Sequence, residues 1–175
     1  MREKSAAVVV SDVREEDQFE VFFQQHYKRV YEVLYRLTGE RMEAEDLMVE
    51  TFVRYFRRPP ENQDQAAGWL YQVATRLGCN ALRASKRRSH YEEKAALYVA
   101  GGSLDPSQEV ERAREQMKVH AVLRKMPQRN AEILVLHHSG FSYKEIAAAI
   151  GVSPNSVGTL ISRAQKEFER IYLGG

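Results

Sequence analysis

The chain has 175 residues and a mass of 20.2 kDa, with 43% apolar and 29% charged residues, as in a soluble globular protein of one domain or two small ones. No apolar run approaches the roughly 18 residues of a membrane-spanning helix, the N-terminus lacks a secretion-signal pattern, and the single Cys79 excludes an internal disulfide and a multi-cysteine zinc site. We therefore expect a cytoplasmic protein without membrane insertion.

Charge is distributed unevenly along the chain, although the net charge is only +2. Residues 1–64 carry a net charge of −4 and residues 92–175 a net charge of +1, whereas residues 65–91 hold 5 basic side chains and no carboxylate. A basic segment without acidic residues, placed between segments rich in them, predicts a local site for phosphate groups rather than a generally basic surface.

The first half of the chain predicts three helices. Residues 1–16 have no sustained apolar period and are predicted to form a mobile leader. From Phe19 apolar residues recur at spacings of three and four up to Gly39, which predicts an amphipathic helix with a glycine cap. A second helix covers residues 44–56 and ends before two prolines, and a third starts near residue 67 and continues into the basic segment.

The second half of the chain begins after a break in the pattern. Residues 97–107 contain glycine, serine and an Asp-Pro pair, which predicts a linker. Helical spacing resumes at Pro106, and a further helix covers residues 130–138. No segment shows strand alternation. We predict an all-α protein of two small helical domains joined by a flexible linker, with a leader at 1–16, a first domain at 17–92, the linker at 93–108 and a second domain at 109–175.

Residues 142–168 give the strongest local signal, two helices joined by a tight turn. Ser142 and Glu145 have the spacing of a capping box, in which each side chain satisfies a free backbone amide at the helix start. Gly151 stands where the turn needs a positive φ, and Ser153 and the proline after it cap and open the next helix. This arrangement is typical of a helix-turn-helix.

The second of these helices has a polar, cation-bearing face opposite its apolar stripe. A recognition helix contacts base edges through such a face, near its N-terminus. Arg and Asn can bind guanine and adenine edges with two hydrogen bonds, whereas Ser and Thr discriminate weakly. Two packed helices without a DNA role would share the caps and the stripe. The candidate DNA-binding residues are Ser153, Asn155, Ser156, Thr159, Arg163 and Lys166.

Motifs in both halves carry a family resemblance. AEDLMVETF at 44–52 and WLYQVA at 69–74 are followed by MPQR at 126–129, GFSYKEIA at 140–147 and SVGT at 156–159. The first two resemble region 2, and the last three region 4, of bacterial RNA polymerase sigma factors of the extracytoplasmic-function (ECF) group in the sigma-70 family. The resemblance covers about residues 17–90 and 109–172.

The resemblance implies that the second helix binds the clamp helices of the polymerase β′ subunit, and that a further contact is made with the β flap. An acidic helix edge suits a basic partner. From the residues alone, a solvated helix start stabilised by the helix dipole and a two-carboxylate metal site are alternatives. The implied polymerase-binding residues are Glu45, Asp46, Leu47, Glu50, Thr51 and Phe52.

The resemblance also implies that region 2 recognises and opens the −10 promoter element. In the family, the loop before the third helix takes a base flipped out of the non-template strand, and the polar loop at residues 60–65 can hydrogen-bond such a base. Cations along the third helix would hold the single-stranded backbone, and we expect Trp69 to pack in the core. The implied −10 residues are Asn62, Gln63, Asp64, Arg76, Asn80, Arg83, Lys86, Arg87 and Arg88.

These observations together predict a sigma factor that binds core RNA polymerase, reads the −35 element with its helix-turn-helix and reads and melts the −10 element with its first domain. Its partners would be the polymerase, promoter DNA as duplex and as melted single strand, and an anti-sigma factor. It would perform no covalent chemistry and need no cofactor or metal. The alternative is a helix-turn-helix regulator acting without core polymerase. A carboxylate-based nuclease, which would need a metal, is a third hypothesis.

Overall fold

The structure, a computed structural model, describes residues 3–84 and 106–174, and it places side chains over residues 17–84 and 110–174. In these two ranges the chain forms helices and no strand, so the prediction of an all-α fold is confirmed. Most of the predicted linker lies outside the described residues.

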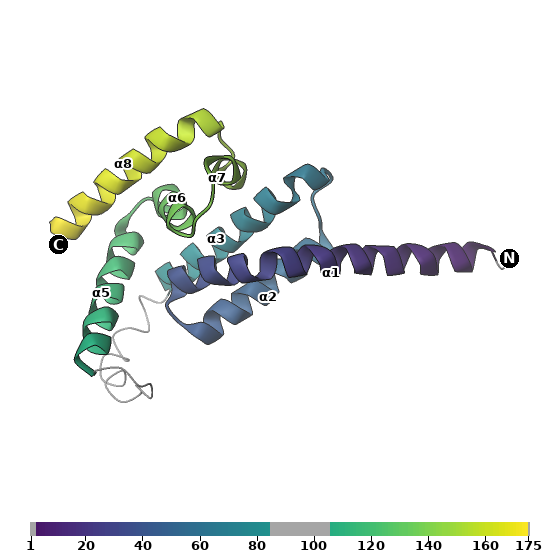
Figure 1. The fold of residues 1–175 in the computed structure, drawn as a ribbon, viewed down its shortest axis with the longest axis horizontal. Coiled ribbons are helices and arrows are strands. Elements are labelled where there is room, and N and C mark those ends of the chain that lie inside the picture. The colour runs from purple at the N-terminus through teal and green to yellow at the C-terminus, as the bar shows by residue number, and fades with distance from the viewer. Residues whose placement is uncertain (1–2, 85–105, 175) are drawn as a thin grey trace.

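The N-terminal helices are α1 (Glu3–Thr38), α2 (Arg41–Arg57) and α3 (Ala66–Ala84), with a short 3-10 turn, η1 (Gln63–Gln65), leading into α3. Helices α2 and α3 pack against the C-terminal half of α1 (Figure 1). Their contact is apolar, because Val30, Leu34 and Leu37 of α1 are fully buried together with Leu70 of α3. The helices expected in the first half of the chain are therefore present and share a core.

Helix α1 starts earlier than the sequence predicts. The absence of an apolar period predicts a mobile leader over residues 1–16, whereas α1 begins at Glu3 and continues through this segment. The physical reason is that residues 3–38 contain neither glycine nor proline, and an established helix extends one residue at a time without needing an apolar face. In Figure 1 this part of α1 extends beyond the other helices.

The chain turns between α1 and α2 within two residues. Gly39 has a φ of 71°, a conformation that glycine adopts without steric cost. Glu40 then caps α2, because its carboxylate accepts hydrogen bonds from the backbone N–H groups of Met42 and Glu43. The prediction that Gly39 ends the first amphipathic helix is confirmed.

The C-terminal helices are α5 (Pro106–Lys125), α6 (Gln128–His138), α7 (Tyr143–Ile150) and α8 (Pro154–Leu173). Their core includes Leu136, Ile146 and Val157, all fully buried. The apolar residues Val110 and Met117 of α5 follow the helical period but are exposed. The first turns of α5, which hold Val110, extend away from the other helices (Figure 1).

The two halves of the chain pack directly against each other. Helix α3 contacts α6 and α7, and α1 contacts α6. The ring of Tyr71 in α3 meets the ring of Phe141, which precedes α7, edge to face with centroids 4.5 Å apart, and both rings are almost fully buried. The described part of the chain thus has one continuous apolar core, and it contains no helix long and apolar enough to span a membrane.

Candidate nucleic-acid and partner interfaces

The predicted capping box holds the start of α7. The Ser142 hydroxyl accepts a hydrogen bond from the Glu145 backbone N–H at 3.3 Å, and the Glu145 carboxylate accepts one from the Ser142 backbone N–H at 2.8 Å. Gly151 ends the helix with a φ of 69°, and its positive φ is the one the tight turn requires. The capping box and the glycine turn of the helix-turn-helix are therefore confirmed.

Ser153 occupies the N-cap position of α8, but its side chain makes no capping hydrogen bond. The amide of Ser156, one of the two donors that a side-chain cap at Ser153 would use, donates instead to the backbone carbonyl of Ser153 at 2.9 Å. The prediction of a side-chain cap at Ser153 is wrong, and the hydroxyl of this exposed residue stays at the surface.

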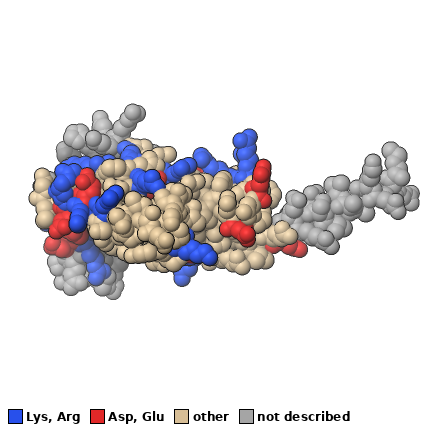
Figure 2. Space-filling view, turned by 90° about the horizontal axis from the view of Figure 1, so that it is seen from above, with Lys and Arg blue, Asp and Glu red and all other residues tan. Residues whose placement is uncertain are grey.

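Helix α8 presents a polar face to solvent. Val157, Ile161 and Ala164 are buried on its inner side, while Leu160 and Phe168, also predicted to be buried, are half-buried. Figure 2, seen from the side of the molecule on which α8 lies, shows Lys and Arg side chains interspersed with Asp and Glu on this side. The sequence-predicted DNA-binding residues are all exposed: Ser153, Asn155, Ser156, Thr159, Arg163 and Lys166.

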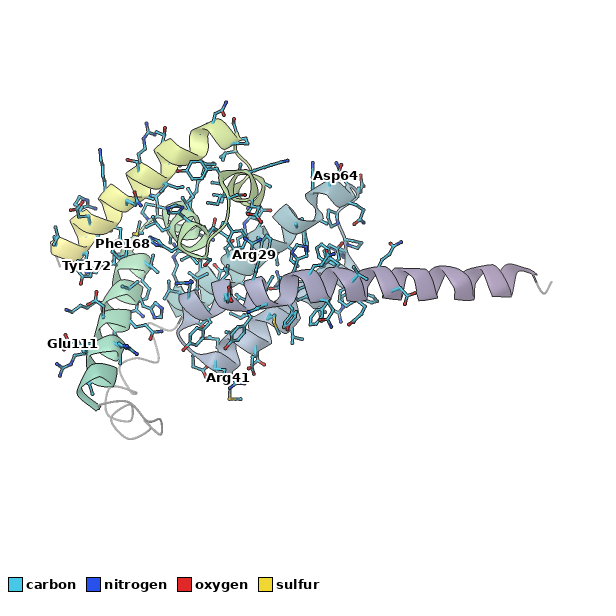
Figure 3. The ribbon with its side chains drawn as sticks, viewed as in Figure 1. Arg29, Arg41, Asp64, Glu111, Phe168 and Tyr172 are labelled. Carbon is cyan, nitrogen blue, oxygen red and sulfur yellow. The ribbon has the colours of Figure 1, made fainter. Side chains whose placement is uncertain are left out.

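The loop before α3 is held by its own side chains. Asn62 caps η1, because its Oδ1 accepts a hydrogen bond from the backbone N–H of Asp64 at 2.9 Å. The Tyr55 hydroxyl donates to Gln63 Oε1 at 3.4 Å. Asn62, Gln63 and Asp64 are all exposed, and Asp64 lies at the outer end of α3, away from α5 (Figure 3). The three polar groups are therefore presented together at one tip of the molecule.

The cations predicted along α3 fall into three groups. Arg76 is exposed, as is the neighbouring candidate Asn80. Arg83 is half-buried instead, because its guanidinium donates to Gln128 Oε1 at 2.9 Å and to the backbone carbonyl of Met126 at 3.4 Å. Lys86, Arg87 and Arg88 lie outside the described residues.

Two uncharged residues of α3, Trp69 and Cys79, pack against the core to different extents. Trp69 is half-buried against the core, with its ring 6.0 Å from that of Tyr55, so the prediction of core packing is met in part. Cys79 is buried, and burial raises the pKa of its thiol to about 12. A thiol with so high a pKa stays protonated and unreactive at neutral pH.

The acidic edge of α2 is partly neutralised within the helix. Glu45 pairs with Arg41 at 2.8 Å, and Glu50 pairs with Arg54. Asp46 is exposed, and Leu47 is half-buried. The carboxylates are therefore available at the surface, but with less net charge than the sequence motif suggests.

Two of the predicted polymerase-binding residues lie in the core instead. Thr51 is fully buried, and its hydroxyl donates to the backbone carbonyl of Leu47 at 2.7 Å. Phe52 is buried with its ring edge-on to that of Phe23, at a centroid distance of 4.7 Å. Neither side chain reaches the surface, because both lie on the side of α2 that packs against α1.

The outer face of α2 carries apolar residues that the sequence interpretation did not single out. Met42 is 71% exposed, Val49 57%, Val53 39% and Phe56 58%. Phe56 was expected on the buried face. With Asp46 these residues follow spacings of three and four, so they form one stripe opposite the buried side of the helix. The sequence does carry a signal for this stripe, because α2 has more apolar residues than one buried helix face can hold.

Among the described residues, no group of three or more His, Cys, Asp or Glu side chains is placed to hold a metal ion. The described residues offer three candidate binding surfaces. They are the polar face of α8, the tip formed by the loop at residues 60–65 and the start of α3, and the apolar stripe of α2.

Two family models match the chain, Sigma-70 region 2 over residues 22–88 and Sigma-70 region 4 over residues 116–167. Together they cover more than half of the chain. The chain therefore belongs to the sigma-70 family.

Curated relatives agree with this assignment. The chain is 33% identical to the ECF RNA polymerase sigma factor SigE of Mycolicibacterium smegmatis, over 85% of this chain and 59% of that protein. It is 29% identical to the ECF RNA polymerase sigma factor BldN of Streptomyces coelicolor, over 90% of this chain and 61% of that protein. The chain thus spans about three-fifths of the length of these relatives.

A solved structure shows the same fold. It is that of CnrH in complex with the cytosolic domain of CnrY, with a TM-score of 0.54 and 18% sequence identity. The match covers 89% of this chain and 88% of that one.

Proposed function

We propose that this chain is a sigma factor that binds core RNA polymerase through α2 and directs transcription initiation at specific promoters. The observation that carries this proposal is the exposed apolar stripe of α2, formed by Met42, Val49, Val53 and Phe56. A stripe of this kind is suited to a partner helix or groove that covers it. Because the chain belongs to the sigma-70 family, we take the partner that covers this stripe to be the clamp of the polymerase.

The same proposal assigns the two DNA elements to the two ends of the chain. The exposed face of α8, with Asn155 and Arg163 near its start, is suited to reading base edges of the −35 element in the major groove. The exposed loop amides of Asn62 and Gln63 and the cation Arg76 are suited to a melted −10 strand. Binding energy, rather than covalent chemistry, would offset the unstacking of bases. Contacts with the β flap and with an anti-sigma factor stay predictions from the family.

The buried residues Thr51 and Phe52 have a different role in this proposal. They hold α2 against α1 and so fix the direction in which the stripe faces. Direct polymerase contacts are left to Asp46, Glu50 and the four apolar residues.

A matched pair of substitutions tests the polymerase contact. Val49 and Val21 are each 57% exposed, on α2 and α1 respectively. Val49→Lys should weaken binding to core polymerase at least about tenfold, because it places an unpaired ammonium in an apolar interface. Val21→Lys makes the same chemical change outside the stripe and should leave binding unchanged. Binding is measured by fluorescence anisotropy with core polymerase from M. smegmatis, and activity by transcription from genomic fragments of the source organism.

Specific transcripts that depend on the wild-type chain and are lost with Val49→Lys would establish the function. Equal binding by the two lysine variants would remove α2 as the polymerase-binding surface. Sequence-specific DNA binding without any initiation would identify a regulator that acts without the polymerase.

A further inference from the structure

A cavity of about 410 Å³ lies among α1, α5, α6 and α8. Cavities that bind small molecules in proteins have volumes of about 300–1,000 Å³, so this one has room for such a ligand. None of the residues considered above for contact with DNA or with the polymerase lines it. The cavity is therefore separate from the three candidate binding surfaces.

The walls of the cavity are apolar. Leu123, Leu134 and Val135 are each at most 5% exposed, and Val119 and Phe168 are half-buried. Figure 3 shows Phe168 where α8 approaches α5. Apolar wall that stays in contact with water is unfavourable, and a ligand gains free energy by covering it. The occupant that fits these walls has an apolar body.

The polar groups of the cavity lie at its rim and include no carboxylate. Arg36 of α1, His138 of α6 and Gln165 of α8 complete the lining, and all three are exposed. Among the described residues, the guanidinium of Arg36 pairs with no carboxylate. A guanidinium presents parallel N–H groups that match the two oxygens of a carboxylate. The rim therefore offers an anion-binding group with no acidic partner of its own.

The charges around the rim favour an anion with a single negative charge. Partial burial, the neighbouring His137 and the charge of Arg36 all lower the pKa of His138. Its imidazole is therefore uncharged at neutral pH and can donate an N–H group, as can the amide of Gln165. Arg36 is then the one full charge on the rim, and it balances one carboxylate. A cationic ligand would be repelled by it.

We propose that this cavity binds a small amphipathic carboxylic acid, with its alkyl body against α5, α6 and α8 and its carboxylate on Arg36. An apolar cavity with a few converging polar groups is the usual form of a small-molecule site, because the walls supply affinity and the polar groups fix the orientation. The proposal concerns binding alone. It does not depend on the function proposed above, so each can fail without the other.

Isothermal titration calorimetry of the full chain tests the class of ligand. Decanoate, kept below its micelle concentration, should bind at one site with a negative change in heat capacity. Affinity should rise about fourfold for each CH₂ from hexanoate to octanoate to decanoate, because each added group is buried. Decanol and decyltrimethylammonium have the same body without the carboxylate, and they should bind at least about tenfold more weakly. Equal affinity for the three head groups, or no saturable binding of decanoate, would overturn the proposal.

Arg36→Gln tests the head-group contact. Glutamine keeps a polar side chain but lacks the charge, so decanoate binding should weaken at least about tenfold while decanol binding stays the same. Arg129→Gln is the matched control, because Arg129 is an exposed arginine of α6 that does not line the cavity. An equal loss in both variants would show attraction to the general charge of the chain, and it would remove Arg36 as the binding group.

Val119→Trp tests the location of the alkyl body. The larger side chain should fill the cavity from α5 and abolish the binding of both decanoate and decanol. Val110→Trp makes the same change on the same helix at a 45% exposed position outside the cavity, and it should bind as the wild type does. Circular dichroism confirms that both variants are folded. A folded Val119→Trp variant that binds decanoate with wild-type affinity would place the ligand elsewhere and overturn the site.

Thermal unfolding separates a site in the folded chain from a detergent effect. A ligand that binds only the folded state raises Tm as its concentration increases. Decanoate should therefore raise the Tm of the wild type and of Arg129→Gln, and raise that of Arg36→Gln less at the same concentration. A Tm that falls with decanoate would show binding to the unfolded chain and would overturn the proposal.

Discussion

Glu145 takes part in two sets of interactions at once. One carboxylate oxygen accepts from Arg29, and the other accepts from the backbone N–H and the hydroxyl of Ser142, each at 2.8 Å. The hydrogen bond from Arg29, opposed by partial burial and supported by Ser142, lowers the pKa of Glu145 to about 2. A single carboxylate therefore both starts the helix-turn-helix and ties it to α1.

Glu145→Gln separates these two roles. Glutamine also serves in a capping box, so the variant keeps the helix start and loses the charge that pairs with Arg29. The free energy of unfolding at pH 7 should fall by only about 0.5–1 kcal/mol, because the Glu145 side chain is 38% exposed and solvent screens the pair.

The pH dependence of this loss follows from the lowered pKa. A carboxylate whose pKa is lower in the folded state stabilises the fold above its unfolded pKa of about 4.3. That stabilisation is lost as the pH falls towards about 2, where the folded-state carboxylate also takes up its proton. Urea unfolding from pH 7 to pH 3 should therefore show wild type and Glu145→Gln converging below about pH 5. A difference that stays constant over this range would show that the ion pair contributes nothing.

At the scale of single helices, periodicity was a reliable guide to where a helix lies and a weaker guide to which side faces the core. The glycine-ended first helix and the capping box of α7 follow from local chemistry that the sequence displays directly. Helix α2 shows the difficulty, because Phe56 continues the apolar spacing but is 58% exposed, with its ring in contact only with the edge of the core at Phe19. A helix with apolar residues on two faces has two faces that could be buried, and only the packing of α2 against α1 decides which one is.

Gly158 of α8 should tolerate alanine, unlike the tightly packed Gly68 and Gly78 of α3, where an added Cβ atom would lie 2.9 Å and 2.5 Å from its nearest neighbour. Gly158 lies in α8, and a Cβ atom there would be 3.4 Å from Cε2 of Tyr143, an ordinary contact. Gly158→Ala should stabilise the chain by about 0.5–1 kcal/mol through helix propensity alone. Thermal unfolding followed by circular dichroism should show a Tm higher by a few degrees. A lower Tm would mean that the Tyr143 ring cannot accommodate the methyl group.

At the scale of the whole molecule, the way in which the two halves pack against each other cannot be predicted from the sequence motifs. Arg29 and Glu145 are separated by 116 positions, and each has a sufficient local explanation, as a surface cation and as a capping carboxylate. Arg83 was expected to face DNA because it belongs to a basic segment, yet it turns towards α6. Long-range contacts of this kind depend on shape complementarity between finished helices, and short sequence motifs do not encode it.

The shared core has a thermodynamic consequence for the whole chain. Because Tyr71 and Phe141 bury each other's rings across the two halves, neither half can unfold without exposing apolar surface of the other, so the wild type should unfold in a single transition. Differential scanning calorimetry should give equal calorimetric and van't Hoff enthalpies for the wild type and for Lys28→Glu, a charge change at an exposed position of α1. Gly68→Ala, whose added Cβ atom would lie 2.9 Å from Cβ of Ala148 in α7, should weaken the contact between the halves and resolve into two transitions. Two transitions in the wild type would contradict a shared core, because two halves that unfold separately are not held by each other.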